Sequence, residues 1–237
     1  MLNKVENNFS YIDENLRIIR ERTGEAFSKY RSPEDTVRIM AVTKTVAPEA
    51  VNHAVSLGLD LLGENRVQEY LSKKDTYEKS AEVQFIGSLQ TNKVKYIIDS
   101  VSMIQSVDSL RLGETISRLA VKNNKVMDIL CEVNIGGEDS KGGVSPSALN
   151  ELIEQLTQLE GIRIRGLMTI PPPSESDIFL GRMQELFNKT ASDKKDIVSM
   201  DILSMGMTHD YTESVKFGST LVRIGTGLFG ARDYGKK

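Results

Sequence analysis

The chain has 237 residues, a formal net charge of −3 and a hydrophobic fraction of 39%. These values are ordinary for a globular protein, and the slight negative charge gives no reason to expect binding to nucleic acid or to an anionic membrane surface. An α/β barrel of about 250 residues is within reach of this length as one unit. We therefore expect a single domain over residues 1–237.

Cysteine and histidine are scarce. Cys131, the one cysteine, lies in the apolar run 128–133, so no intrachain disulfide can form and a small buried side chain is expected. His53 and His209, the two histidines, have no neighbours at metal-ligand spacing, so no metal site is predicted. No signal-peptide pattern and no run of about 18 apolar residues occurs. We expect a cytoplasmic protein that does not enter a membrane.

The first part of the chain has a helical pattern. Its apolar residues recur at spacings of three, four and their multiples: Val5, Phe9, Ile12, Leu16, Ile19 and Phe27. This spacing predicts an amphipathic helix over residues 3–30. Ser32-Pro33 ends it.

Strand-like and helix-like patterns alternate from there to the end. The apolar runs typical of buried strands are 37–42, 59–63, 83–89, 101–107, 127–133, 162–170, 202–205 and 221–224. The helical patterns between them are 48–57, 67–74, 91–98, 109–122, 145–159, 175–188 and 210–217, with caps such as Ser109 and Ser145-Pro146. Continuous apolar strands separated by helices predict a parallel α/β fold. The count of eight favours a single (β/α)8 TIM barrel with an additional N-terminal helix over an open doubly wound sheet, which the same alternation permits.

In such a barrel the chemistry lies at the carboxyl ends of the strands. The first strand delivers Lys44, and the second ends in Glu64 and Asn65. The seventh and eighth end in the segments 204–206 and 225–226, which are rich in glycine and small hydroxyl residues. Loops at these two strands commonly hold a phosphate through backbone N–H groups, although each glycine is equally suited to a simple tight turn.

Arg223 lies within an apolar strand and, with a period of two, shares a face with Gly225. A guanidinium there needs a partner, either a salt bridge to Glu64 or Asp201, or a ligand. Barrel closure would place Lys44 one strand, about 4.8 Å, from the strand of Arg223. A ligand with a phosphate at one end and an aldehyde at the other would span this mouth. We infer pyridoxal 5'-phosphate, held by Lys44 as a Schiff base.

Six motifs then carry a resemblance to a known family: AVTKT (41–45), GEN (63–65), FIGSLQTNK (85–93), RGLMTI (165–170), LSMGM (203–207) and VRIGT (222–226). In this order they resemble the pyridoxal phosphate homeostasis protein family over nearly the whole chain. The resemblance implies a barrel similar to the N-terminal domain of alanine racemase, the cofactor on Lys44, and a role in vitamin B6 and amino-acid homeostasis without an established reaction. Ser88 and His209 depart from the histidine and the acidic residue that are frequent in the family, so we expect the rim of the pocket to differ while Lys44 and the phosphate loops are kept.

The predicted cofactor-binding residues are Lys44, Asn65, Ser204, Met205, Gly206, Arg223, Gly225 and Thr226. Asn65 would reach the ring hydroxyl of the cofactor, or else stabilise a turn. The resemblance to alanine racemase implies that Arg223 faces the pyridine nitrogen. Because a guanidinium only donates, the nitrogen would stay unprotonated and the ring would be a weaker electron sink.

We expect a cofactor carrier or homeostasis factor that acts as a monomer, with apo pyridoxal phosphate enzymes as candidate recipients. One alternative is an amino-acid racemase of weak or narrow activity, and another is a regulatory module that binds a partner protein in a cofactor-dependent way. Racemisation needs an acid and a base on opposite faces of the substrate carbon. Only Tyr211 and Tyr234 suggest themselves beside Lys44, and packing or surface roles fit both tyrosines better.

Overall fold

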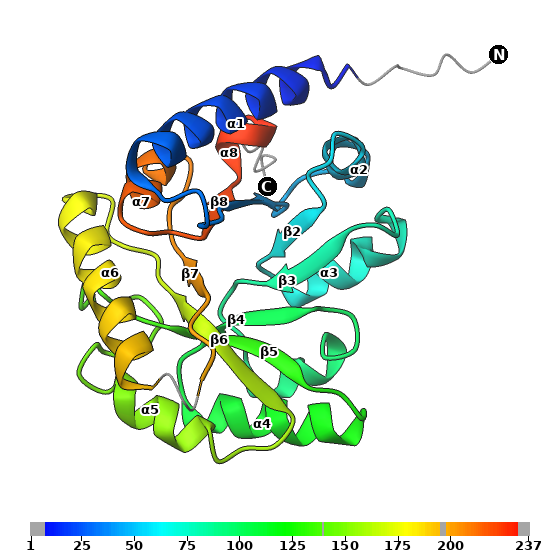
Figure 1. The fold of residues 1–237 in the computed structure, drawn as a ribbon. Helices are drawn as coiled ribbons and strands as arrows, with labels where there is room; N and C mark the ends of the chain where they lie inside the picture. The colour runs from blue at the N-terminus through cyan, green and yellow to red at the C-terminus, as the bar shows by residue number, and fades with distance from the viewer. Residues whose placement is uncertain (1–7, 139, 195–197, 232–237) are drawn as a thin grey trace.

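The apolar runs form parallel strands in a computed structural model of the chain, which describes residues 8–138, 140–194 and 198–231 (Figure 1). The strands are β1 (Arg38–Val42), β2 (Leu61–Glu64), β3 (Glu82–Phe85), β4 (Met103–Val107), β5 (Met127–Glu132), β6 (Ile162–Met168), β7 (Ile202–Ser204) and β8 (Leu221–Ile224). The α-helices are α1 (Ser10–Tyr30), α2 (Pro48–Ser56), α3 (Val67–Lys73), α4 (Leu110–Lys122), α5 (Leu149–Leu156), α6 (Ser176–Asp193), α7 (Tyr211–Lys216) and α8 (Thr226–Phe229). Two short 3₁₀ helices, η1 (Lys74–Thr76) and η2 (Thr91–Tyr96), complete the described elements.

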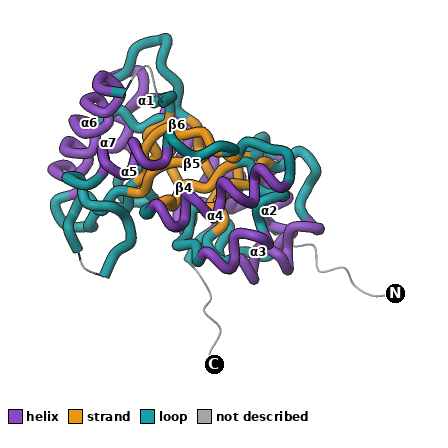
Figure 2. Tube along the Cα trace, turned by 90° about the horizontal axis from the view of Figure 1, so that it is seen from below, coloured by secondary structure: helices purple, strands orange, loops and turns teal. Residues whose placement is uncertain are grey.

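The sheet closes on itself in the order β1 to β8. β1 pairs in parallel with β8, and Arg38 lies opposite Leu221 at the start of both strands. Figure 2 shows the strands gathered at the centre with helices around them. The predicted (β/α)8 barrel is confirmed, and the alternative of an open doubly wound sheet is wrong.

Alternation along the strands separates the inside of the barrel from the helix-covered outside. Met40 and Val42 of β1 pack inside, against Leu61 and Leu221. Ala41, between them, belongs to the large cluster shared with the helices. The direction of each side chain at the mouth follows from this parity.

The N-terminal helix α1 packs against α2, α7 and α8, beside the closure of the barrel (Figure 1). The reason is the length of α8, which spans only Thr226–Phe229 and cannot cover the seam alone. Ile12 and Leu16 supply the missing apolar surface, and Asn15 Nδ2 donates to Leu228 O at 3.0 Å. The predicted additional helix therefore completes the outer layer.

Several predicted boundaries differ from the structure; the helix predicted at 175–188, for example, continues to Asp193 in α6. The N-terminal helix begins at Ser10 in the structure; predicted positions 3–7 lie outside the described residues. The helix predicted at 145–159 begins at Leu149, because Ser145 Oγ accepts from Ala148 N at 3.3 Å in a turn that precedes the helix. The segment predicted as a helix at 91–98 is the 3₁₀ helix η2.

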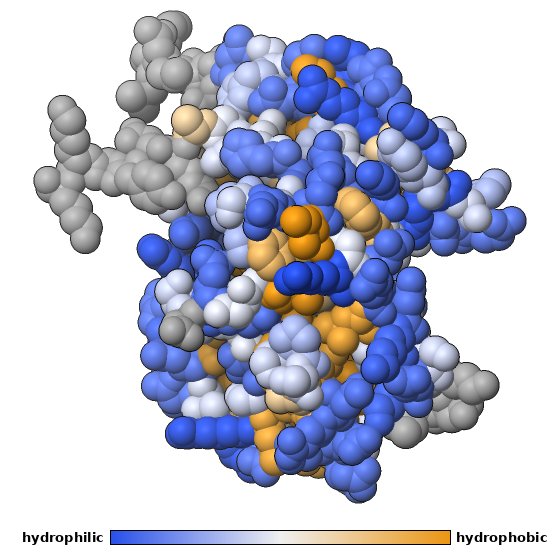
Figure 3. All heavy atoms as spheres, turned by 90° about the vertical axis from the view of Figure 1, so that its left-hand side faces the viewer, coloured by the Kyte–Doolittle hydropathy of each residue, from blue (hydrophilic) through white to orange (hydrophobic). Residues whose placement is uncertain are grey.

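The face seen from the side of α6 and α7 is mostly hydrophilic, with apolar residues gathered across its middle (Figure 3). Such a polar outer surface is expected of helices whose apolar stripe faces a sheet. In the described ranges no helix has the length and apolar character that crossing a membrane requires.

Candidate functional site

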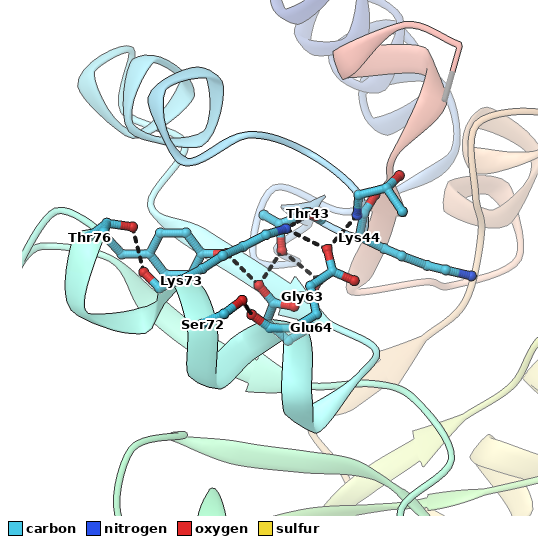
Figure 4. Close-up of polar contacts among 10 residues, drawn as sticks. Thr43, Lys44, Gly63, Glu64, Ser72, Lys73 and Thr76 are labelled. Carbon is cyan, nitrogen blue, oxygen red and sulfur yellow. Dashed lines mark hydrogen bonds and ion pairs between the residues drawn. The ribbon is translucent and has the colours of Figure 1, made fainter. Parts of the chain in front are cut away.

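Lys44 lies two residues beyond β1, where the chain turns toward α2 at the mouth of the barrel. Its side chain is half-buried. Because Met40 and Val42 point into the barrel, the alternation carries Lys44 to the same side. Figure 4 shows it extending away from Glu64 and Lys73. The amine is thus directed away from the polar cluster beside it.

Arg223 stands on the neighbouring strand but deeper in the barrel. The pairing of β1 with β8 places Met40 opposite Arg223, so Lys44 lies four residues nearer the mouth, roughly 13 Å of extended chain. The Arg223 side chain is buried, with 3% exposed. Lys44 and Arg223 are therefore too far apart along the barrel for direct contact, and a ligand bound between them could touch both side chains.

The partners of Arg223 are neutral groups. Nη1 donates to Ser204 Oγ at 2.6 Å, and Nη2 donates to Thr169 O at 2.7 Å. Of the two alternatives for Arg223, the salt bridge to Glu64 or Asp201 is wrong, because Asp201 accepts from Arg165 at the opposite end of the barrel and Glu64 faces the helices. Burial lowers the pKa of Arg223 to about 10, against the opposing effect of nearby carboxylates, so the group stays charged at neutral pH.

A chain of hydrogen bonds continues from Arg223 through the barrel interior. Ser204 Oγ donates to Gln105 Oε1 at 2.7 Å, Gln105 Nε2 donates to Gln84 Oε1 at 2.6 Å, and Gln84 Nε2 donates to Glu82 Oε1 at 2.8 Å. Guanidinium only donates and carboxylate only accepts, so the two ends set the direction of every bond. Sequence reasoning missed Gln84 and Gln105, although a glutamine between apolar residues of a strand was a visible signal.

Glu64 belongs to a separate cluster behind the sheet (Figure 4). Its Oε1 accepts from Thr43 Oγ1 at 2.7 Å and from Tyr77 OH at 2.5 Å. Burial raises the pKa of Glu64, while the hydrogen bonds from Tyr77 and Thr43 oppose that rise. Glu64 therefore supports the end of β1 from the helix side and does not reach the barrel interior.

Asn65 has a buried Oδ1 without a hydrogen-bond partner among the described residues. The turn-stabilising alternative would have paired this atom. The backbone around it is tight, because a Cβ at Gly87 would lie 2.1 Å from Asn65 O. A buried acceptor that nothing in the described chain satisfies is the type of group that a bound molecule pairs with.

The loop after β7 depends on Gly206. It has φ +94°, and a Cβ there would lie 2.1 Å from Ser214 Oγ, so only glycine fits. Gly206 O accepts from Arg223 N at 2.9 Å, which joins this loop to β8. The Met205 side chain packs in the outer core, so only its backbone can face the mouth. The Ser204 hydroxyl is also unavailable at the mouth, because it is bonded to Arg223 and Gln105 inside the barrel.

The loop after β8 begins at Gly225, which is the N-cap of α8. Gly227 N donates to Thr208 Oγ1 at 3.0 Å, and Thr226 Oγ1 lies 3.3 Å from the same oxygen. Thr208, which was not predicted, thus ties the two loops together. Leu228 N and Phe229 N both donate to Gly225 O at 3.0 Å, so these first N–H groups of α8, like that of Gly227, are already paired within the chain.

Glu132, at the end of β5, is a further residue that sequence reasoning missed. The position of a Cβ on Gly142 would be 3.7 Å from both Glu132 carboxylate oxygens and 3.9 Å from Asp108 Oδ2, so the two carboxyl groups face the same glycine. Burial, together with Asp108, raises the pKa of Glu132 to about 7, although Arg223 lowers it. The visible signal was an acidic residue that ends an apolar strand.

The remaining predicted residues lie as follows. Ser88 and His209 are exposed, which places both departures from the family pattern at the surface. Tyr211 is 7% exposed and packs in the core, and Tyr234 is outside the described residues. No group of three or more His, Cys, Asp or Glu in the described ranges could hold a metal ion.

The residues at the mouth fit the predicted cofactor. Asn65 offers an unpaired buried acceptor, and Gly206 sits where a side chain could not. Arg223 uses Nη1 and Nη2 once each, which leaves further N–H groups of its five for a ligand. Asn65 and Arg223 lie at or on β2 and β8, the two strands that flank β1 and Lys44 in the closed barrel.

Comparison with known proteins agrees with the family resemblance of the six sequence motifs. The family model for the alanine racemase N-terminal domain matches residues 9–233. The pyridoxal phosphate homeostasis protein of Aquifex aeolicus is 41% identical over 226 residues, which cover 93% of this chain and 98% of that protein.

Two solved structures extend the comparison. PipY of Synechococcus elongatus, solved with PLP bound, is 29% identical with a TM-score of 0.78 and covers 92% of this chain and 100% of that one. Alanine racemase from Corynebacterium glutamicum has a TM-score of 0.72 at 14% identity, covering 97% of this chain and 63% of that one. The second likeness concerns the fold alone.

Proposed function

The chain belongs to the alanine racemase N-terminal domain family, with pyridoxal phosphate homeostasis proteins as its relatives, and on this premise we propose that it binds pyridoxal 5'-phosphate and acts in vitamin B6 and amino-acid homeostasis. PipY, solved with PLP bound, supports the choice of cofactor. We further propose that the protein works in the cytoplasm as a monomer and delivers the cofactor to apo enzymes.

The observation that carries the proposal is the placement of Lys44 at the same mouth as Arg223 and Asn65. A primary amine, a buried guanidinium and an unpaired buried oxygen come from β1, β8 and β2, three adjacent strands of the closed barrel. The cofactor would supply an aldehyde, a phosphate and a ring that accepts electrons. Lys44 Nζ would hold the aldehyde as a Schiff base, which releases one water, and the loops around Gly206 and Thr226 would hold the phosphate.

Arg223 would determine what the bound ring can do. Its guanidinium stays charged in its buried position, so it can donate to the ring nitrogen but cannot accept a proton there. This disfavours reactions that need a strongly electron-accepting ring. Storage and transfer of the cofactor make no such demand, so we favour the carrier over the racemase. Tyr211 packs in the core, which leaves it poorly placed as the second acid or base of a racemase.

The binding proposal is tested by titrating the purified protein with pyridoxal 5'-phosphate and following visible Schiff-base absorption. Lys44→Ala is expected to lose the band. Lys95→Ala, on the exposed side of η2, is the matched control and should keep it. An unchanged band in Lys44→Ala would show that another amine holds the cofactor.

The carrier proposal needs a separate measurement. Loaded protein is mixed with an apo pyridoxal phosphate enzyme, and reactivation of that enzyme is compared with the rate at which the cofactor leaves into buffer. Faster reactivation than free release supports direct transfer. A chiral assay across a panel of amino acids, with turnover abolished in Lys44→Ala, would instead establish the racemase.

A further inference from the structure

One ion pair on α3 holds the backbone on both sides of Lys44. Thr45 N donates to Glu69 Oε1 at 2.6 Å, and Lys73 Nζ donates to Thr43 O at 3.2 Å. Glu69 and Lys73 are bonded to each other at 2.5 Å. The Thr43 carbonyl belongs to the peptide before Lys44, and the Thr45 N–H belongs to the peptide after it. Both peptide groups that flank the Lys44 Cα are therefore fixed by the same pair of side chains.

The segment that this pair holds is strained. Thr45 has φ +61°, in the left-handed region, where a β-branched residue is rare and costly. Its Oγ1 donates to Lys44 O at 2.7 Å, and Val46 N donates to Thr43 O at 3.0 Å, so the turn has two local contacts of its own. Such a conformation persists only where its surroundings enforce it. The bond from Thr45 N to Glu69 is the tertiary contact at this residue that can do so.

The ion pair is shielded from water. The side chain of Lys73 is 13% exposed and that of Glu69 is 17% exposed. Burial alone would raise the pKa of Glu69, but the hydrogen bonds from Lys73 and the Thr45 backbone bring it below its usual range. The contacts are thus charge-assisted and partly desolvated, which makes them stronger than those of a surface pair.

Lys73 is a second amine close to the predicted anchor, but its geometry suits support. Its Nζ donates both to Glu69 and to the Thr43 carbonyl. In Figure 4 it points to the backbone at Thr43, whereas Lys44 extends the other way. The two amines therefore have different tasks, and only Lys44 is directed away from the cluster.

We propose that Glu69 and Lys73 are positioning residues, which clamp the strained turn at Thr45 so that Lys44 meets the cofactor aldehyde in one orientation. This inference rests on the proposed function, since it takes Lys44 as the residue that binds the aldehyde. The clamp acts on the backbone, and neither side chain contacts the cofactor. Small misplacements of a reacting group cost large factors in rate, so even a modest relaxation of this turn would be measurable.

The first experiment measures the rate of Schiff-base formation and the Kd for pyridoxal 5'-phosphate in Glu69→Ala and Lys73→Met. Both variants are expected to form the Schiff base about 10- to 100-fold more slowly, with a higher Kd. Glu154→Gln is the matched control, because Glu154 pairs with Lys194 at the same 2.5 Å but far from the mouth in the fold. Because the Glu154 side chain is 64% exposed, this variant should change the Tm little and leave the rate unchanged.

The second experiment separates positioning from general stability. Asparagine tolerates the left-handed conformation better than threonine, so Thr45→Asn should reduce the need for the clamp. We expect Glu69→Ala to slow the reaction less in a Thr45→Asn background than in the native chain. A merely structural role for Glu69 would give the same factor in both backgrounds, and that outcome overturns the proposal.

A third measurement is independent of cofactor binding. Amide hydrogen exchange at Thr45 should accelerate in Glu69→Ala and remain unchanged in Glu154→Gln. Unchanged exchange in Glu69→Ala would overturn the clamp even if Lys44 proved to be the anchor. If Lys44→Ala keeps the absorption band while Thr45 exchange still accelerates, the proposed anchor fails and the clamp on the backbone stands.

Discussion

Arg223 donates a hydrogen bond from Nη1 to the hydroxyl of Ser204 at 2.6 Å, and this contact fixes the guanidinium from within the barrel. Ser204 was predicted to bind phosphate, but its side chain is fully buried and donates its hydrogen bond to Gln105 Oε1. A barrel interior is usually filled by branched apolar residues. The polar chain below Arg223 therefore marks a part of the core that serves the orientation of one cation.

Replacing Gln105 by leucine is predicted to destabilise the fold. The substitution would leave the Ser204 hydroxyl without its acceptor and Gln84 Oε1 without its donor, both inside the barrel. Loss of one partner of a buried polar group costs about 1–3 kcal/mol, and two groups lose theirs here. Urea unfolding of Gln105→Leu should show a lower midpoint. Gln155→Leu on the exposed face of α5 is the control, expected within about 0.5 kcal/mol. Equal stability of the two variants would contradict an energetic role for the chain.

Gly206→Ala is predicted to weaken both the fold and the loop between β7 and α7. The new methyl group would lie 2.1 Å from Ser214 Oγ at φ +94°, so the backbone must shift. We expect a loss of about 2–4 kcal/mol in the free energy of unfolding and a higher Kd for inorganic phosphate and for the cofactor.

Gly24→Ala is the opposite case, because this glycine lies within α1 with no atom near its Cβ position. It should raise stability by about 0.5–1 kcal/mol. Thermal unfolding of both variants measures the contrast, and equal destabilisation would refute this account.

The barrel could be predicted from the sequence because its strands are almost uninterrupted apolar runs. Lys44 could be located in the same way, since a polar residue at the end of such a run is easy to see. The strand boundaries were less accurate, because apolar residues continue beyond the last hydrogen bond between neighbouring strands. For example, β3 ends at Phe85, although the apolar run reaches residue 89. At that point the close approach of Gly87 to Asn65 ends the regular pairing.

The partners of the functional residues could not be predicted. Arg223 donates to a backbone carbonyl, that of Thr169, and every residue has one, so no pattern identifies it. Glu69 and Lys73 have the i,i+4 spacing of an ordinary surface ion pair. Only the packing of α3 against the end of β1 shows that this pair contacts the backbone around Lys44.

Arg223→Glu is predicted to change the protonation of the bound cofactor. It replaces a group that only donates by one that accepts, so the ring nitrogen would be protonated more readily. The visible absorption of the bound cofactor should shift and titrate at a different pH. The pH titration of the spectrum measures this, with Arg223→Lys as the variant that keeps the positive charge. Arg163→Glu, on an exposed side chain, should titrate like the native protein. The same titration in Arg223→Glu and the native protein would argue against the contact.

Glu132→Gln is predicted to flatten the dependence of stability on pH. The pKa of Glu132 is raised from an ordinary 4.5 to about 7, so between these values the folded protein binds more protons than the unfolded chain. Stability from this group is therefore fully present below about pH 4.5 and is lost as pH rises toward about 7, by roughly 1–3 kcal/mol. Glutamine stays neutral at every pH.

Urea unfolding should accordingly find Glu132→Gln more stable than the native protein at about pH 8 and nearly equal to it at about pH 4.5. Other titrating groups are common to both chains and cancel in the difference, and Glu151→Gln on the exposed side of α5 should keep the native slope. Parallel profiles for Glu132→Gln and the native protein would show that this carboxyl titrates as it does in the unfolded chain.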